Sequence, residues 1–165
     1  MTPIDSLMLA THDAVRAASQ AWFAGGTGKT PSPAPGAFQP LPGTQALRVL
    51  IVEDEAIVAM SLESLIEDFG FEVCAIASTG EQAVALAASL RPDLILMDVN
   101  LIGDMDGVEA ARRARKVVDA RIVFVTAYGG EMLERIRATV PDSLVVAKPV
   151  MGPALLEAIE RTRPQ

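Results

Sequence analysis

A short apolar run at residues 94–98 reads Leu94-Ile95-Leu96-Met97-Asp98 and ends in a single acid. The four residues of the run before that acid are all apolar, which is typical of a strand buried on both faces of a parallel sheet. Four further apolar runs of the same character lie at residues 49–52, 73–77, 122–125 and 144–147. We therefore expect five strands, each buried between layers of helices.

Helical patterns lie between these runs. The apolar residues of the first pattern share one helix face: Val58, Leu62, Leu65, Ile66 and Phe69. Gly70 is a suitable stop for that helix. Further helical patterns cover residues 80–90, 106–118, 130–139 and 152–162. The alternation of strands and helices predicts an α/β domain over residues 47–165, with a doubly wound, five-stranded parallel sheet.

The first 46 residues differ in composition from the rest. They hold two acids and two bases, so the net charge of −7 belongs to the α/β domain. Apolar residues recur at helical spacing and predict a short amphipathic helix within residues 1–24. Residues 25–46 contain five prolines and a glycine cluster, which predict a linker.

Composition excludes several classes of function. The acidic balance argues against nucleic acid as a partner, because phosphate attraction needs a basic face. Cys74 and His12 are the only cysteine and histidine, which excludes intrachain disulfides, a Ser-His-Asp triad in the domain and two-histidine metal sites. The sequence shows no secretory signal and no apolar stretch of membrane-spanning length, so we expect no membrane contact and a cytoplasmic protein.

Polar residues stand at the carboxyl ends of four predicted strands. They are Glu53-Asp54, Asp98, Thr126 and Lys148. Because these ends meet at one edge of a parallel sheet, we expect three carboxylates to lie close together and to repel one another. A hard divalent cation with oxygen ligands, most plausibly Mg²⁺, resolves that repulsion. For any one of these residues the alternative is a helix cap, but four complementary strand ends favour a site.

Residues 47–164 resemble the receiver domain of bacterial two-component response regulators. The motifs that carry the resemblance are Val49-Leu50-Ile51-Val52-Glu53-Asp54-Glu55, Asp93-Leu94-Ile95-Leu96-Met97-Asp98, Asp106-Gly107, Val125-Thr126-Ala127 and Lys148-Pro149. Each motif alone is weak, but their order and spacing across five strands are specific. The resemblance implies a flavodoxin-like receiver fold and does not extend to residues 1–46.

The resemblance also implies the identity of the site residues. Asp98 is the expected phosphoacceptor, a nucleophilic carboxylate that forms an acyl phosphate. Glu53, Asp54 and Asp98, with the backbone carbonyl of Asn100, are the expected Mg²⁺ ligands.

The remaining site residues follow from the same likeness. Lys148 is expected to pair with a phosphoryl oxygen and to precede Pro149 through a cis peptide bond. Thr126 is expected to move toward the phosphoryl group and so to switch a surface near the fourth strand and helix.

The sequence departs from the family pattern in three places. Val145 occupies the position of the usual switch aromatic, and we expect Tyr128 to take over that role. The loop from Asp98 to Gly107 lacks the usual proline and is one residue longer than usual. These features are similar to stand-alone receivers and to receivers of the bacterial general stress response. We also expect the N-terminal amphipathic segment to dock near the fourth helix.

These observations predict a signalling module rather than an enzyme. The resemblance implies a sensor histidine kinase or a histidine phosphotransfer protein as phosphodonor. Residues 1–46 are too few for a DNA-binding output domain, so we expect output through an unidentified downstream protein, with homodimerisation left open. The alternatives are a flavin-binding module, for which no residue argues, and a phosphatase of the haloacid-dehalogenase type. Phosphatases of that type carry a second aspartate, which acts as general acid, two residues after the nucleophilic aspartate. In this sequence the residue two positions after Asp98 is Asn100.

Overall fold

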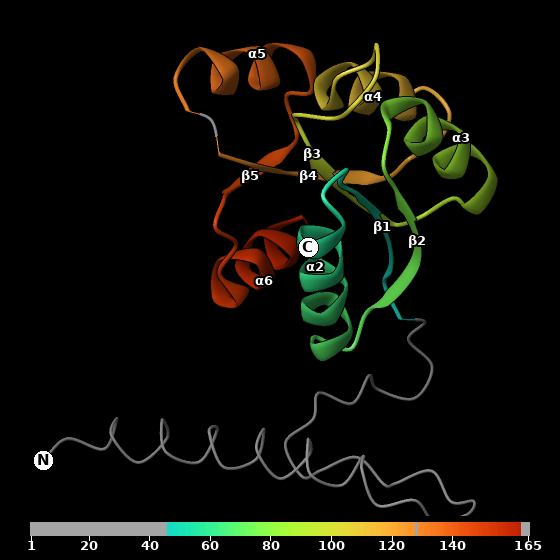
Figure 1. Ribbon diagram of the computed structural model, residues 1–165, viewed down its shortest axis with the longest axis vertical. Helices are drawn as coiled ribbons and strands as arrows, with labels where there is room; N and C mark the ends of the chain where they lie inside the picture. Colours follow the sequence, from blue (N-terminus) through green and yellow to red (C-terminus); the bar gives the residue numbers. More distant parts are fainter. Residues whose placement is uncertain (1–45, 128, 163–165) are drawn as a thin grey trace, which may run out of the picture. The chain divides into compact units, whose positions relative to one another are not determined.

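The computed structural model describes residues 46–127 and 129–162, in which strands and helices alternate (Figure 1). The elements, in chain order, are β1 (Arg48–Val52), α2 (Ala56–Asp68), β2 (Glu72–Ala77), α3 (Gly80–Leu90), β3 (Leu94–Asp98), α4 (Gly107–Ala114), β4 (Arg121–Thr126), α5 (Glu131–Thr139), β5 (Leu144–Ala147) and α6 (Gly152–Arg161). The predicted helix at residues 1–24 and Tyr128 lie outside the described residues, as does the predicted linker at residues 25–46 apart from Ala46.

The sheet has the order β2-β1-β3-β4-β5, and every neighbouring pair of strands is parallel. Helices α3, α4 and α5 cover one face of the sheet, and α2 and α6 cover the other (Figure 1). This arrangement confirms the predicted doubly wound α/β fold with five parallel strands. The strand order reverses direction next to β1, which places the carboxyl ends of β1 and β3 side by side.

The core consists of two apolar clusters, one on each face of the sheet. One cluster joins strand residues such as Ile95 and Phe124 to α3, α4 and Ile136 of α5. The other joins Val49 and Leu96 to α2 and α6. Because side chains alternate between the two faces along each strand, every central strand contributes to both clusters.

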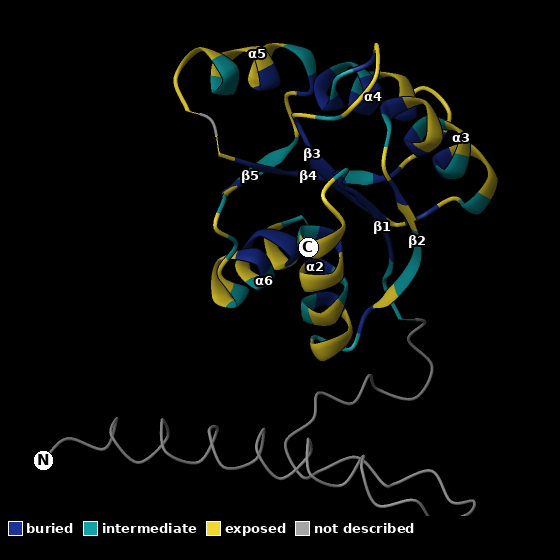
Figure 2. Ribbon diagram, viewed as in Figure 1, coloured by how far each residue is buried: buried dark blue, intermediate teal, exposed yellow. Residues whose placement is uncertain are grey.

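The two edge strands differ from the prediction. The three central strands β1, β3 and β4 are buried almost throughout, as expected for strands covered on both faces (Figure 2). The prediction of burial on both faces is wrong for β2 and β5, where most residues are half-buried or exposed. Ile76 of β2 is 40% exposed, for example. An edge strand has a hydrogen-bonded neighbour on one side only, so solvent reaches its outer side.

The helix predicted at residues 106–118 is shorter than expected. α4 ends at Ala114, because the N–H groups of Lys116 and Val117 turn back to the carbonyls three residues before them. This tightened last turn redirects the chain and places Val118 in the core, at 8% exposure. The helix predicted at residues 80–90 is confirmed at both ends: Thr79 accepts a hydrogen bond from the N–H of Gln82, and Arg91 adopts a left-handed conformation before a proline.

None of the helices within the described ranges combines the length and the apolar character that crossing a membrane requires.

Gly107 fixes the start of α4 against the end of β3. Its N–H donates to the carbonyl of Val99 at 2.9 Å. A Cβ atom on Gly107 would overlap the backbone carbonyl oxygen of Asp98. The first turn of α4 and the backbone of Asp98 are therefore in direct contact, and only glycine allows this approach.

We predict that Gly107→Ala lowers the free energy of unfolding by about 1–3 kcal/mol, because the added methyl group must push α4 away from β3. Gly129→Ala is the matched control, since a Cβ atom there meets nothing within 4 Å. Urea denaturation of both variants measures the difference. Equal stabilities for the two variants would contradict the contact between Gly107 and Asp98.

Candidate functional site

The predicted site residues converge at one edge of the sheet. Asp98 is the last residue of β3 and Thr126 is the last residue of β4. Glu53 follows β1 directly, and Lys148 follows β5 directly. The register pairs Asp98 with Val125 across the sheet, which brings these strand ends to the same level.

Three carboxylates form the centre of the site. One oxygen of each of Glu53, Asp54 and Asp98 lies within 4.8 Å of the others. Glu53 and Asp98 are buried, at 2% and 6% exposure, and Asp54 is half-buried. Such crowding of negative charge away from water is unfavourable unless a cation offsets it.

Lys148 is the protein cation that offsets this charge. Its Nζ donates to Glu53 Oε2 and to Asp98 Oδ2, each at 2.8 Å. The backbone N–H of Lys148 donates to the carbonyl of Thr126 at 2.9 Å, which holds β5 beside β4 at this point. The peptide bond from Lys148 to Pro149 is cis, as the resemblance implied.

The pKa values of Glu53 and Lys148 reflect both their burial and the hydrogen bond between them. Burial raises the pKa of Glu53 above its ordinary 4.5; the hydrogen bond from Lys148 offsets part of that rise, and the charge of Asp98 adds to it. Burial by itself would lower the pKa of Lys148, but the hydrogen bonds to Asp98 and Glu53 and the negative charges of these two residues together outweigh burial and raise the pKa above 10.5. Lys148 therefore keeps its positive charge at neutral pH.

A pocket of about 220 Å³ opens over the carboxylates. Its lining consists of Asp54, Glu55, Asp98, Asn100, Ala127 and Lys148. Asn100 is exposed, and its backbone N–H donates to Asp98 Oδ1 at 3.2 Å. Thr126 is buried, at 1% exposure, and the next residue, Ala127, lines the pocket instead.

Two lining residues, Glu55 and Ala127, stand in the motifs of the resemblance but were not predicted as site residues. Glu55 directly follows the acidic pair at the end of β1, so its position in the sequence could have indicated it. Ala127 carries no functional group, and only its place after Thr126 could have pointed to it. The backbone N–H of Glu55 donates to Glu53 Oε1 at 3.3 Å, so both oxygens of Glu53 already have a hydrogen-bond donor.

The donor set fits Mg²⁺. Three carboxylates and the backbone carbonyl of Asn100, which lines the pocket, offer oxygen atoms, and oxygen atoms are the ligands that this ion prefers. Lys148 provides one positive charge against three negative charges, so a divalent cation has a clear electrostatic reason to bind here. Asp54 is the member of the cluster that faces both the pocket and solvent.

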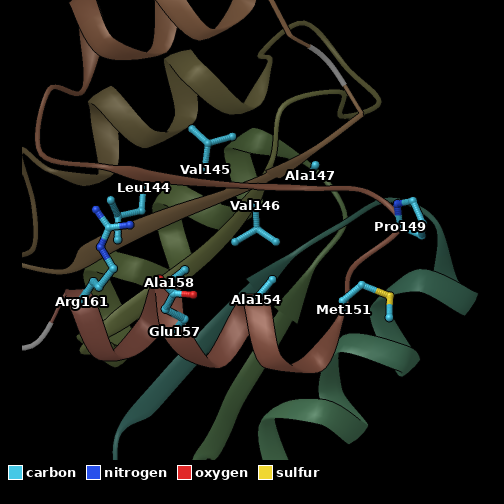
Figure 3. Close-up of a pocket in the computed structure, with 10 residues that line it drawn as sticks. All are labelled: Leu144, Val145, Val146, Ala147, Pro149, Met151, Ala154, Glu157, Ala158 and Arg161. Carbon is cyan, nitrogen blue, oxygen red and sulfur yellow. The ribbon is translucent and has the colours of Figure 1, made fainter.

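A second hollow lies directly beyond the site on the β5 side. It is a groove of about 400 Å³ between β5 and α6, and Figure 3 shows its lining side chains. Ala147 and Pro149, which flank Lys148 in the chain, form one end of it. Val145, at the position of the usual switch aromatic, is half-buried and also lines the groove.

Comparisons with known proteins agree with this geometry. Residues 49–160 match the model of the response regulator receiver domain. Over 120 residues the chain is 36% identical to the phyllosphere-induced regulator PhyR of Methylorubrum extorquens, a match that covers 72% of this chain and 44% of PhyR. It is also 36% identical over 120 residues to the chemotaxis protein CheY of Bacillus subtilis, which covers 71% of this chain and 98% of CheY.

A solved structure shows the same likeness. The signal receiver domain of a modulated diguanylate cyclase from Desulfovibrio desulfuricans superimposes with a TM-score of 0.66 at 36% identity, over 71% of this chain and 93% of that domain. The chain therefore belongs to the response regulator receiver domain family of two-component signalling. It spans less than half the length of PhyR. Receiver domains bind Mg²⁺ at an acidic pocket of this kind and interact with sensor kinases or phosphotransfer proteins.

We predict that, with a chelator present at neutral pH, Lys148→Gln lowers the free energy of unfolding by about 1–3 kcal/mol. This is less than the roughly 3–5 kcal/mol lost when a fully buried pair is broken, because the Lys148 side chain is 19% exposed. Lys116→Gln, an exposed lysine of the same charge, is the control. Denaturation curves in urea measure both losses.

The loss caused by Lys148→Gln shrinks as the pH falls from neutral toward 4.5, the ordinary pKa of a glutamate. Lys148 lowers the pKa of Glu53, so the variant raises that pKa further. A carboxyl with a raised folded-state pKa takes up its proton in the folded protein before the unfolded chain does, so falling pH favours the folded state in this window. A loss that is independent of pH would show that Lys148 acts by packing alone.

Proposed function

We propose that this chain is a signalling protein controlled by phosphorylation, in which Asp98 accepts the phosphoryl group. The observation that carries the proposal is the position of Lys148 Nζ, 2.8 Å from an oxygen of Asp98 inside an acidic pocket. A fixed ammonium group at this distance is placed to receive an oxygen of an incoming phosphoryl group. The membership of the receiver domain family supports the same role.

Transfer requires an in-line attack by a carboxylate oxygen of Asp98 on phosphorus. The new bond joins that oxygen to phosphorus, and the bond from phosphorus to the donor breaks, with its electron pair leaving on the donor. Lys148 exchanges its contact with Asp98 for a contact with the phosphoryl oxygens, and so offsets the charge that accumulates there. Hydrolysis by water later releases phosphate and restores the carboxylate.

Glu53, Asp54, Asp98 and the carbonyl of Asn100 are the residues that we propose to hold Mg²⁺. When bound, the ion would offset the negative charge of the carboxylates and of the phosphoryl group. Asp54 would be a direct ligand, since its carboxylate faces the pocket. Glu53 would contact the ion through water, since Lys148 and the Glu55 N–H already occupy its oxygens.

The partners follow from the same chemistry. A histidine kinase or a histidine phosphotransfer protein would supply the phosphoryl group, and an unidentified downstream protein would read it. Thr126 and Tyr128 are the proposed switch residues, since Thr126 ends β4 and Tyr128 follows it by two residues. The groove between β5 and α6 supports output by protein contact, because Pro149 connects it directly to Lys148. Homodimerisation is a further proposed outcome, and the acidic charge argues against nucleic acid.

The phosphatase alternative has no support at the site. Its general acid would stand two residues after Asp98, and that residue is Asn100, which cannot donate and recover a proton in that role. We therefore propose signalling rather than catalysis.

We predict that Asp98→Asn abolishes labelling by acetyl phosphate and Mg²⁺, because the amide is not a nucleophile toward phosphorus. The parent chain gains one phosphoryl group in intact mass spectrometry, and the product is labile to base. Asp104→Asn is the matched control, an exposed aspartate of the same loop, and labels like the parent. Undiminished labelling of Asp98→Asn would place the acceptor elsewhere.

We also predict that Asp54→Asn weakens Mg²⁺ binding by about tenfold or more, because it removes a charged direct ligand. Glu53→Gln has a smaller effect, and Asp68→Asn, at the end of α2, has none. Calorimetric titration of the full chain with Mg²⁺ compares the three variants. Unchanged binding by Asp54→Asn would mean that the ion lies elsewhere.

A further inference from the structure

Asp106 connects two helices through its side chain. It is the N-cap of α4, and its Oδ1 accepts a hydrogen bond from the N–H of Glu109 at 2.9 Å. Its Oδ2 forms an ion pair with Nη2 of Arg135, on α5, at 2.7 Å. The two oxygens of one carboxylate therefore hold the start of α4 and the middle of α5 together.

Asp106 is also tied to Asp98. The next residue, Gly107, packs so closely on the carbonyl of Asp98 that no side chain fits between them. The N–H of Gly107 donates to the carbonyl of Val99, which follows Asp98 in the chain. A displacement of the Asp98 backbone must therefore move Gly107 and, with it, Asp106.

α5 contributes little buried apolar surface to the core: Ile136, with Met132 half-buried beside the same cluster. Of its residues, all of which the structure describes, only Ile136 is buried, and the outer side of the helix is exposed (Figure 2). The helix begins after Gly130, which has a positive φ of 58° and open space around it. A second ion pair, between Arg115 and Asp142 at 3.2 Å, connects the end of α4 to the segment after α5. These two ion pairs thus contribute to the position of α5, in addition to the buried contact of Ile136.

We infer that the ion pair between Asp106 and Arg135 couples the state of Asp98 to the position of α5, and that it stabilises the arrangement with a free Asp98 carboxylate. The inference rests on the proposed function, in which Asp98 is the phosphoacceptor. The arrangement seen here is that of the free carboxylate, since Lys148 Nζ contacts Asp98 Oδ2 directly. Arg135 is accordingly a positioning residue that acts through Asp106.

Coupling between two sites is reciprocal, so a pair that stabilises one state of Asp98 must lower the affinity for a ligand that favours the other state. Removing the pair therefore raises that affinity. The Arg135 and Asp106 side chains are 47% and 38% exposed. Because the ion pair is solvent-exposed, we expect its removal to raise that affinity by about two- to fivefold.

The test uses beryllofluoride with Mg²⁺, which mimics the phosphoryl group on an aspartate, and measures its affinity for the full chain by calorimetry. Arg135→Gln binds the mimic about two- to fivefold more tightly than the parent. Asp106→Asn does the same, because asparagine keeps the N-cap oxygen and removes the charge. The double variant gains no more than either single variant, as expected when both remove one interaction.

Arg137→Gln is the control, since Arg137 is an exposed arginine of the same helix. It keeps the parent affinity. If Arg135 had a merely structural role, its variant would lose stability to urea while its affinity for beryllofluoride stayed unchanged, and that result overturns the inference. Weaker binding by Arg135→Gln also overturns it. A parent chain that binds no beryllofluoride overturns the proposed function, and the inference fails with it.

Discussion

Repulsion among three carboxylates at one end of a buried sheet is the constraint on which the site depends. Lys148 offsets it with two hydrogen bonds of 2.8 Å, one to Glu53 and one to Asp98. These bonds connect the strand ends of β1, β3 and β5, which are far apart in sequence. β5 is an edge strand, and Lys148, which follows it directly, thus connects its end to the ends of β1 and β3.

The sequence was sufficient to predict the fold and the place of the site. Unbroken apolar runs such as the one before Asp98 indicated buried parallel strands, and the carboxyl ends of such strands meet at one edge. The sequence therefore predicted that Glu53, Asp98 and Lys148 lie close together, and the structure confirms this. The roles of these residues in phosphorylation stay predictions, as does the switch role of Tyr128.

Other features could not be predicted, because they depend on strand order and on contacts across the sheet. The run at residues 73–77 is as apolar as a central strand, but it forms the edge strand β2. α4 ends early, and the tight turn after it places Val118 in the core. The helical pattern of residues 106–118 gives no sign of that turn. The direct bond between Lys148 and Glu53 joins residues 95 positions apart, and no local signal encodes it.

The thin anchor of α5 has a consequence for how this domain can diversify. Its buried contact with the sheet is made by Ile136, while most of its other side chains are exposed. Substitutions on that outer surface change few core contacts, so they alter the free energy of unfolding little. The part of the domain next to the end of β4 can thus acquire new recognition surfaces without a new fold. The residue that anchors this helix in the core and the residues that form its outer surface are thus largely separate.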